Sequence, residues 1–221
     1  MPRNPAGGEP PRIYDLSPRI APGFPVWPGD TDFASQLTWK LADGASVNLS
    51  ALTTTPHLGS HADAPFHTEP DGATAADLPL APFLGPCRVV AVPPEPLIEP
   101  HFLGDVDPAD PPRLLLKTGS IPPLAAGAPF PERFSALSPA LARHLGERGT
   151  LLVGLDTPSV DPFHSKTLDA HHALAAGGVA ILEGLDLSRV PPGVYELIAL
   201  PLKLAGLDAS PVRAVLRGLP G

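Results

Sequence analysis

The sequence PHLGSHADAPFH, at residues 56–67, gathers three of the chain's eight histidines and an aspartate into one short stretch. Its ionisable residues all occupy odd positions: His57, His61, Asp63 and His67. Successive side chains of an extended chain point to opposite faces, so these four would project from the same face. At ~3.3 Å per residue, however, the alpha carbons of His57 and His61 would lie ~13 Å apart, too far to share a metal ion comfortably. We therefore expect a bend at Gly59, the residue best able to adopt a bulge or a positive φ.

Two imidazoles and a carboxylate on one face indicate a metal site. Neutral histidine nitrogen and carboxylate oxygen are suitable ligands for zinc, and also for iron or manganese. Three protein ligands leave coordination positions open, which is typical of catalytic rather than closed structural sites. The alternative is that the histidines are grouped by chance or occupy hydrogen-bonded structural positions.

A second group of candidate ligands lies in LDAHHALAAGGVAILE, at residues 168–183. The pattern predicts a helix that carries two histidines, a glycine turn, and a strand that ends in a carboxylate. Packing of the helix against the strand can bring His171 or His172 beside Glu183. The alternative is an ordinary helix face and a solvent-exposed glutamate.

The remaining chain favours strands over helices. Short apolar runs bounded by proline, glycine or aspartate predict strands at 13–16, 36–41, 47–54, 87–92, 113–117, 151–155, 179–182, 195–203 and 212–216. Ser138, as N-cap, and Pro139 begin a helix that we expect to end at Gly149, and a second helix is expected over 168–176. Each helix is followed at once by a strand. We expect a single α/β domain with a mixed, strand-rich sheet or barrel-like core and flanking helices.

Composition limits the classes of partner. The formal net charge is −8 with no basic cluster, which argues against nucleic acid binding. No apolar run approaches the ~20 residues that span a bilayer, and the start of the chain lacks an apolar signal core, so we expect a cytoplasmic protein. Residues 1–11 are predicted to be a disordered lead and 12–221 the folded domain. Cys87 is the single cysteine; it excludes an intrachain disulfide and is expected to be buried.

The histidine-rich stretch resembles the signature of the cyclase-type metal-dependent hydrolases, a family that includes bacterial kynurenine formamidase. That signature reads His-x-Gly-Thr-His-x-Asp-x-Pro-x-His, and here Ser60 replaces the threonine but keeps its hydroxyl. Further similar segments cover nearly the whole chain: 14–18, 26–30, 84–90, 156–162, 165–172 and 210–216. Trp27-Pro-Gly-Asp30 together with Lys166-Thr-Leu-Asp-Ala-His-His172 is most similar to the formamidase branch.

The resemblance implies roles for individual residues. His57, His61 and Asp63 would bind one metal ion. Asp63 and His171, rather than His172, would bind a second. Glu183 would contact both ions. His67 would donate and accept protons, and Trp27 would line the substrate pocket. The resemblance also implies a homodimer and two divalent ions, usually zinc.

The expected reaction is hydrolysis of a small-molecule substrate, N-formyl-L-kynurenine, to L-kynurenine and formate in tryptophan degradation. One alternative is a related hydrolase that opens a cyclic amide such as isatin, and another is a non-catalytic metal-binding protein. The sequence contains no Gly-x-Ser-x-Gly elbow for a serine nucleophile and no phosphate-binding loop of the Walker type. Structural roles are expected for His101, His144 and His164.

Overall fold

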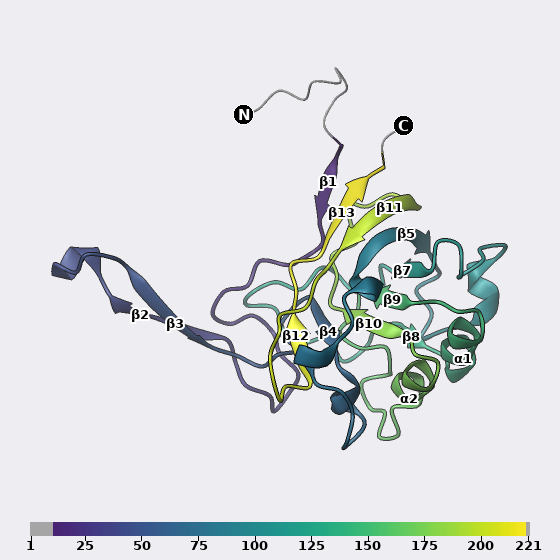
Figure 1. The fold of residues 1–221 in the computed structure, drawn as a ribbon, viewed down its shortest axis with the longest axis horizontal. Helices are drawn as coiled ribbons and strands as arrows, with labels where there is room; N and C mark the ends of the chain where they lie inside the picture. The colour runs from purple at the N-terminus through teal and green to yellow at the C-terminus, as the bar shows by residue number, and fades with distance from the viewer. Residues whose placement is uncertain (1–10, 220–221) are drawn as a thin grey trace.

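The computed structural model describes residues 11–219, so all but the last residue of the predicted lead lies outside the described residues. A nine-stranded sheet forms the body of the molecule (Figure 1). Its strands, in spatial order, are β1 (Ile13–Asp15), β13 (Val215–Gly218), β11 (Gly193–Ile198), β5 (Leu84–Ala91), β7 (Arg113–Lys117), β9 (Leu152–Leu155), β10 (Ala180–Glu183), β4 (His61–Asp63) and β12 (Ala209–Pro211). The sheet curls into a half-barrel, which confirms the predicted α/β class with a mixed, strand-rich core.

The sheet mixes parallel and antiparallel pairs. The central strands β5, β7, β9 and β10 are mutually parallel, and the pairs toward both edges are antiparallel. The parallel pairs follow from crossover connections, because a helix between β9 and β10 returns the chain to the same end of the sheet. Parallel strands need cover on both faces, and these strands are accordingly rich in buried leucine and valine.

Two helices cover one face of the sheet: α1 (Pro139–Glu147) and α2 (Asp169–Ala176). Ser138 caps α1, since its Oγ accepts a hydrogen bond from the Leu141 N–H at 3.1 Å. The helices approach closely where Gly146 meets Gly177, because a Cβ on Gly146 would lie only 2.8 Å from the Gly177 Cα. This contact holds α2, and the histidines on it, against α1.

The opposite face of the sheet encloses a second apolar core. This core includes Leu16, Phe83, Cys87, Leu115 and Leu182, all fully buried. Burial raises the pKa of the Cys87 thiol to about 12, and its predicted position in the core is confirmed. Both faces are thus packed with apolar side chains, and polar residues concentrate where strands end.

A two-stranded hairpin projects away from the body (Figure 1). It consists of β2 (Ala34–Trp39) and β3 (Leu49–Thr53), joined by a turn that includes the 3-10 helix η1 (Leu41–Asp43). Every residue of both strands is exposed. We call residues 34–53 the arm.

The predicted elements are largely confirmed, and the largest differences occur at prolines and in short strands. The strand expected over 195–203 ends at Ile198, before Pro201, and the strand expected over 212–216 begins only at Val215. The sequence pattern missed β4 and β12, and also β6 (Leu97–Ile98) and β8 (Ala136–Leu137).

The other 3-10 helices are η2 (Pro65–His67), η3 (Ala75–Asp77), η4 (Ala81–Phe83) and η5 (Pro100–Leu103). Within residues 11–219, no helix has both the length and the apolar character needed to cross a membrane.

Candidate metal centre

A sharp bend at Gly59 positions the histidine-rich stretch. Gly59 has φ +61°, which confirms the expected bend. It fits tightly, since a Cβ on it would lie 2.8 Å from the Ile20 side chain, and one on Gly184 would lie 2.1 Å from the Gly59 carbonyl oxygen. The Ser60 hydroxyl can donate to the carbonyl of Gly184 or of Leu16, at 2.9 and 3.2 Å. Two close backbone segments are therefore fixed to each other immediately before β4.

Strand pairing then brings carboxylates to both sides of β4. In the register with β10, His61 lies directly opposite Glu183. In the register with β12, Asp63 lies opposite Ala209, and Asp208 precedes that residue. Three segments distant in the sequence thus meet at β4 through backbone pairing alone.

The first group of candidate ligands is His57, His61 and Asp63, whose ligand atoms all lie within 4.8 Å of one another. Asp63 Oδ1 is 3.3 Å from His57 Nδ1 and 3.5 Å from His61 Nε2. His61 Nε2 is also 3.3 Å from Glu183 Oε2. The geometry suits one cation held by these side chains.

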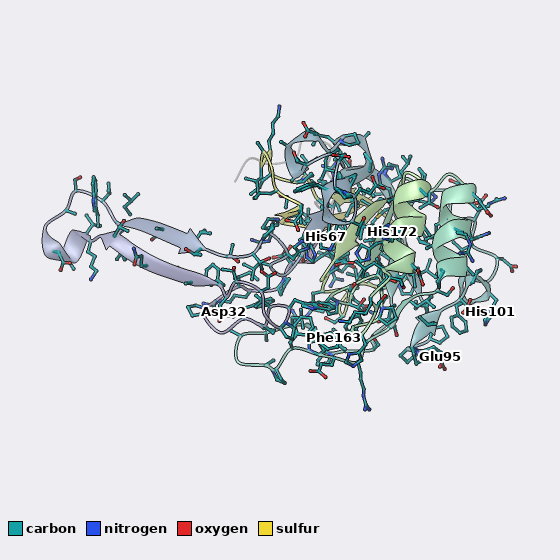
Figure 2. The ribbon with its side chains drawn as sticks, turned by 90° about the horizontal axis from the view of Figure 1, so that it is seen from below. Asp32, His67, Glu95, His101, Phe163 and His172 are labelled. Carbon is teal, nitrogen blue, oxygen red and sulfur yellow. The ribbon has the colours of Figure 1, made fainter. Side chains whose placement is uncertain are left out.

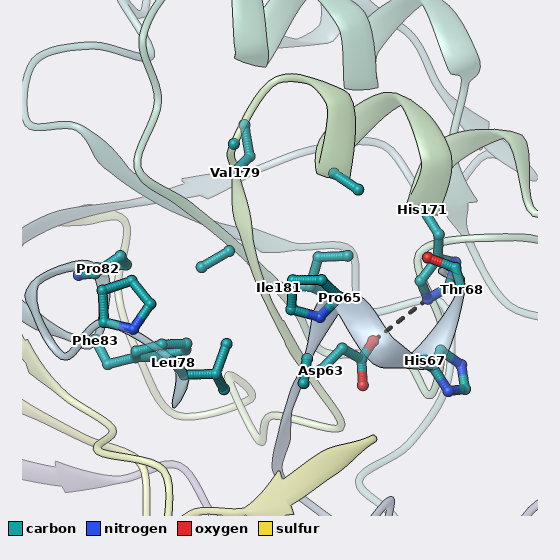
Figure 3. A pocket seen from close by; sticks show the side chains of 15 residues that line it. Asp63, Pro65, His67, Thr68, Leu78, Pro82, Phe83, His171, Val179 and Ile181 are labelled. Atoms are coloured by element: carbon teal, nitrogen blue, oxygen red, sulfur yellow. Dashed lines mark ion pairs between the residues drawn. The ribbon is translucent and has the colours of Figure 1, made fainter. Parts of the chain in front are cut away.

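The second group shares Asp63 with the first and adds His171 and Glu183. His171 Nε2 lies 3.3 Å from Asp63 Oδ2, drawn as a dashed line in Figure 3, and 3.5 Å from Glu183 Oε1. His172, the neighbour that the sequence pattern left open, is exposed on α2 and lies outside both groups. The structure therefore brings together the five residues expected to be ligands, with Asp63 and Glu183 placed between two positions.

Whether these residues fit a metal can be judged from the buried polar atoms that lack a hydrogen-bond partner. Among residues 11–219, seven buried side-chain atoms lack such a partner, and four of them belong to this cluster: His61 Nε2, both carboxylate oxygens of Asp63, and His171 Nε2. These atoms approach one another, yet none of their contacts has hydrogen-bond geometry. Leaving four such atoms unsatisfied would cost roughly 1–3 kcal/mol each. Divalent cations bound here would satisfy all four, so the donor set fits a metal.

In His61 and His171, the Nδ1 atom, on the other side of the ring from the candidate ligand atom Nε2, is held by a hydrogen bond. His61 Nδ1 lies 2.9 Å from the Gly59 carbonyl oxygen, which can only accept, so Nδ1 is the donor there and Nε2 faces the carboxylates of Asp63 and Glu183. His171 Nδ1 donates in the same way to Asp161 Oδ2 at 2.7 Å. Such contacts fix the tautomer and orientation of metal-binding histidines.

Asp161 has a role that the sequence pattern did not reveal. Besides the His171 ring, its carboxylate accepts the backbone N–H groups of Ala170 and His171, each at 3.0 Å. Burial would raise the pKa of Asp161, but these hydrogen bonds, above all that from the His171 ring, keep it below its usual value. The carboxylate thus fixes both the first turn of α2 and the ring on it.

Asp208 is a second residue that the pattern missed. Its Oδ2 lies 3.0 Å from His57 Nε2 and 3.2 Å from His67 Nδ1, and the three residues form a third group of possible ligands. Only its position just before the Ser-Pro-Val-Arg stretch, one of the family-like segments, hinted at a role. Asp208 connects His57, a candidate ligand, to His67, the candidate proton-transfer residue.

The electrostatics of the cluster favour cations. Burial alone would lower the pKa of His57, but the carboxylates of Asp208 and Asp63 outweigh it and raise this pKa to about 10. Burial is outweighed at His171 too, mainly by Asp161 and Asp63, and its pKa is also raised to about 10. The histidines in turn hold the pKa of Asp63 well below its usual range, despite burial, and hydrogen bonding to His57 lowers that of Asp208. The carboxylates remain ionised and attract positive charge.

A cavity of ≈ 530 Å³ opens on the cluster. His57, His61, His171 and Glu183 line one part of it, and Trp27, Phe130 and Phe163 line another. The Trp27 ring centroid is 4.9 Å from that of Phe163 and 5.2 Å from that of Phe130. Trp27 therefore lines this cavity, and its contact with a substrate stays a prediction. The cavity combines a polar wall of candidate metal ligands with an aromatic one.

A smaller cavity of ≈ 180 Å³ lies beside the same cluster (Figure 3). Asp63, His67 and His171 meet at one end of it, and apolar side chains such as Leu78 and Phe83 lie at the other. His67 lines both cavities. Its ring therefore borders the larger space, where a substrate can bind, and the apolar one.

The remaining histidines lie outside the cluster. His101, His144 and His164 belong to none of the ligand groups found within residues 11–219. Figure 2 shows His101 at the end of the molecule remote from the arm, whereas His67 and Phe163 lie nearer the base of the arm. The His164 ring packs 4.9 Å from the ring of Phe163.

Comparison with known proteins supports a metal-dependent enzyme. The family model described as "Putative cyclase" matches residues 14–162. A potential metal-dependent hydrolase with cyclase activity is 28% identical and superposes with a TM-score of 0.80, over 96% of this chain and 100% of that one. A protein described as a predicted metal-dependent hydrolase from Bacillus stearothermophilus is 27% identical, with a TM-score of 0.78 over 95% and 99% of the two chains. Isatin hydrolase A from Labrenzia aggregata, at 22% identity and a TM-score of 0.75 over 95% and 94%, shares the fold.

Proposed function

The chain belongs to the cyclase family and shares the fold of a potential metal-dependent hydrolase, and from this we propose a reaction. The chain would hydrolyse the formamide of N-formyl-L-kynurenine to formate and L-kynurenine. One observation carries the proposal. His61 and His171, whose buried Nε2 atoms have no hydrogen-bond partner among the described residues, line one wall of a cavity whose other wall is aromatic. The polar atoms suit a metal-assisted hydrolysis, and the rings suit an aryl substrate.

We propose two divalent ions, with zinc as the usual metal. His57, His61 and Asp63 would hold one ion, and Asp63 with His171 and Glu183 would hold the other. Asp63 and Glu183 each present two oxygens to the cluster, so each can bind both ions. When bound, such ions act as Lewis acids and lower the pKa of water toward neutrality.

His67 is proposed to protonate the departing aryl amine. The Asp208 carboxylate is ionised and accepts from His67 Nδ1 at 3.2 Å, which orients the ring and leaves Nε2 to give or take a proton. Histidine is suited to this work near neutral pH, since its unperturbed pKa is ~6.5. His67 lines the cavity beside the ligand groups, within reach of a substrate there.

The aromatic wall is proposed to hold the substrate ring. Trp27 and Phe163 are tilted toward each other by 35°, and Phe130 meets Trp27 edge-on. Aromatic pairs of this kind contribute roughly 0.5–1.5 kcal/mol beyond the burial of area, and a substrate ring bound among them would gain similarly. The wall thereby fixes the ring while the formamide faces the metal centre.

The exposed apolar side chains of the arm lead us to propose a homodimer. Its apolar side chains are in solvent: Leu52 is 67% exposed and Trp39 57%. A lone two-stranded hairpin is only marginally stable in water, and exposed apolar surface of this kind marks interaction sites. A second copy of the chain is the partner we propose to cover it, in keeping with the prevalence of two-fold homodimers.

The experiment is a substrate panel with zinc-loaded protein. Hydrolysis of N-formyl-L-kynurenine is followed by the absorbance of kynurenine, and ring opening of isatin is measured in parallel. We expect formylkynurenine to be turned over with the higher kcat/KM. Turnover of isatin but not of formylkynurenine would overturn the formamidase proposal in favour of a cyclic-amide hydrolase, and a metal-loaded protein inert toward formamides, esters and lactams would favour a binding role.

A further inference from the structure

The larger cavity contains two charged residues that the metal centre does not use. Among the described residues that line it, Lys166 and Asp30 are the charged groups outside the histidine and carboxylate cluster. Lys166 is exposed, and no ion pair or hydrogen bond within residues 11–219 involves its ammonium group. The ammonium is therefore available to a ligand in the cavity.

The segment that carries Lys166 is fixed in place. The Ser165 N–H donates to the Pro162 carbonyl at 2.8 Å, and Ser165 Oγ accepts the Leu168 N–H at 3.1 Å. Leu168 has φ +48°, and no other non-glycine residue in 11–219 has a positive φ. Such strained backbone persists where the surrounding structure holds it, and it is concentrated at functional sites. The segment then enters α2, which carries His171.

This segment joins three surfaces of the cavity. Phe163 belongs to the aromatic wall, Lys166 supplies a positive charge, and His171 belongs to the metal centre. We propose that Lys166 binds a carboxylate on the substrate, so that the preferred substrates are aryl amides that carry an anionic group. This inference rests on the proposed function and deepens it, because it names the group that recognises the end of the substrate remote from the reacting amide.

Asp30 fits the same substrate class. Its carboxylate would repel a substrate carboxylate and attract an ammonium group, so the two residues together suit the zwitterionic end of an α-amino acid. A neutral lactam such as isatin has neither charge and gains nothing from Lys166. The two charges in the cavity lining thus favour an amino-acid-bearing formamide over a cyclic amide.

The test compares two substrates that differ only at the charged end. N-Formyl-L-kynurenine carries the amino acid, and 2′-formamidoacetophenone keeps the ring, ketone and formamide without it. We measure the ratio of kcat/KM for the two substrates in zinc-loaded protein. Lys166→Ala should lower this ratio about tenfold, as expected for a partly exposed charge-assisted hydrogen bond. Lys166→Arg should restore much of it, and the matched control Lys203→Ala, an exposed lysine outside the cavity lining, should not change it.

A binding measurement gives a readout independent of turnover. L-Kynurenine and 2-aminoacetophenone are titrated against the metal-free protein, and quenching of tryptophan fluorescence reports binding near Trp27. Lys166→Ala should weaken the binding of L-kynurenine about tenfold relative to the binding of 2-aminoacetophenone. Both formamides could be hydrolysed while Lys166→Ala changes neither the kcat/KM ratio of the two formamides nor the affinity ratio of L-kynurenine and 2-aminoacetophenone. In that case the assignment of Lys166 is wrong and the proposed function stands. Background rates with both formamides would overturn the proposed function and this assignment with it.

Discussion

The metal centre buries ionisable side chains, whereas the arm leaves apolar ones in water. Asp63 is 7% exposed and Glu183 3%, while Leu52 on the arm is 67% exposed and Trp39 57%. Both arrangements are costly for an isolated chain, because buried charge needs a partner and exposed apolar surface favours association. The proposed cations would balance the buried carboxylates, and the proposed second copy of the chain would cover the arm.

The two regions also differ in how they are held. The metal centre is fixed by pairing of β4 with β10 and β12 and by the Asp161 and Asp208 carboxylates. The arm is held by contacts within itself, mainly the pairing of β2 with β3. Precise chemistry requires the first kind of support, since side chains must be fixed before substrate arrives. The proposed role of the arm in docking a second copy does not require that kind of support.

The largest expected effect in this comparison comes from Asp63→Asn. The change removes a charge shared by both candidate metal positions. We expect loss of bound metal and a fall in kcat/KM well beyond the ~100-fold typical of losing a group that only orients a ligand. Metal content by atomic absorption and the hydrolysis rate measure it. Asp43→Asn, in the turn of the arm, is the matched control and should keep both values; a full metal complement in Asp63→Asn would contradict the bridging role.

Next in size is His67→Ala, which separates chemistry from metal binding. Loss of a general acid–base group costs ~10²–10⁴ in rate. We expect a fall in kcat in this range with the metal content retained, and little change in the control His101→Ala. If metal is lost together with activity, His67 is a ligand through the Asp208 group instead of a proton-transfer residue.

Asp161→Asn tests the support of the metal centre. The carboxylate accepts three hydrogen bonds from His171 and Ala170, and an amide oxygen replaces it poorly opposite the ring. We expect metal affinity to fall ~10–100-fold while the fold is kept. Competition with a coloured chelator measures the affinity. An unchanged affinity would show that packing alone, without Asp161, orients the ring.

The smallest effect on monomer stability is expected at the arm. Leu37→Asp with Leu52→Asp places charges on one face of the hairpin, since the register pairs Leu52 with Ser35 and Leu37 with Ser50. We expect a homodimer to dissociate, with a change of within about 0.5 kcal/mol per substitution in the free energy of unfolding of the monomer. Light scattering after gel filtration gives the mass. A wild-type chain that is already monomeric would contradict the proposed homodimer.

Sequence reasoning recovered the residues whose spacing is local. The histidine stretch has a recognisable pattern, and the glycine between its first two histidines marks the bend. The helix at Ser138 has a cap and a proline in the expected places, and both helices lie where predicted. Local signals of this kind need no knowledge of tertiary contacts.

The residues that were missed depend on tertiary pairing. Asp208 reaches His57 across 151 positions of sequence, through the pairing of β12 with β4. Each of these strands has three residues, too few for an alternating pattern to be visible. The choice of His171 over His172 likewise depends on which side of α2 faces Asp161, and the packing of α2 against α1 and the sheet decides it.

The most direct test of the metal centre is the rate of N-formyl-L-kynurenine hydrolysis after removal of metal by a chelator and titration with zinc. Activity should fall to background in the stripped protein and return as zinc binds, reaching its maximum at two ions per chain. Activity that persists without metal, or a rate that stays at background although zinc is bound, would contradict a metal-dependent formamidase.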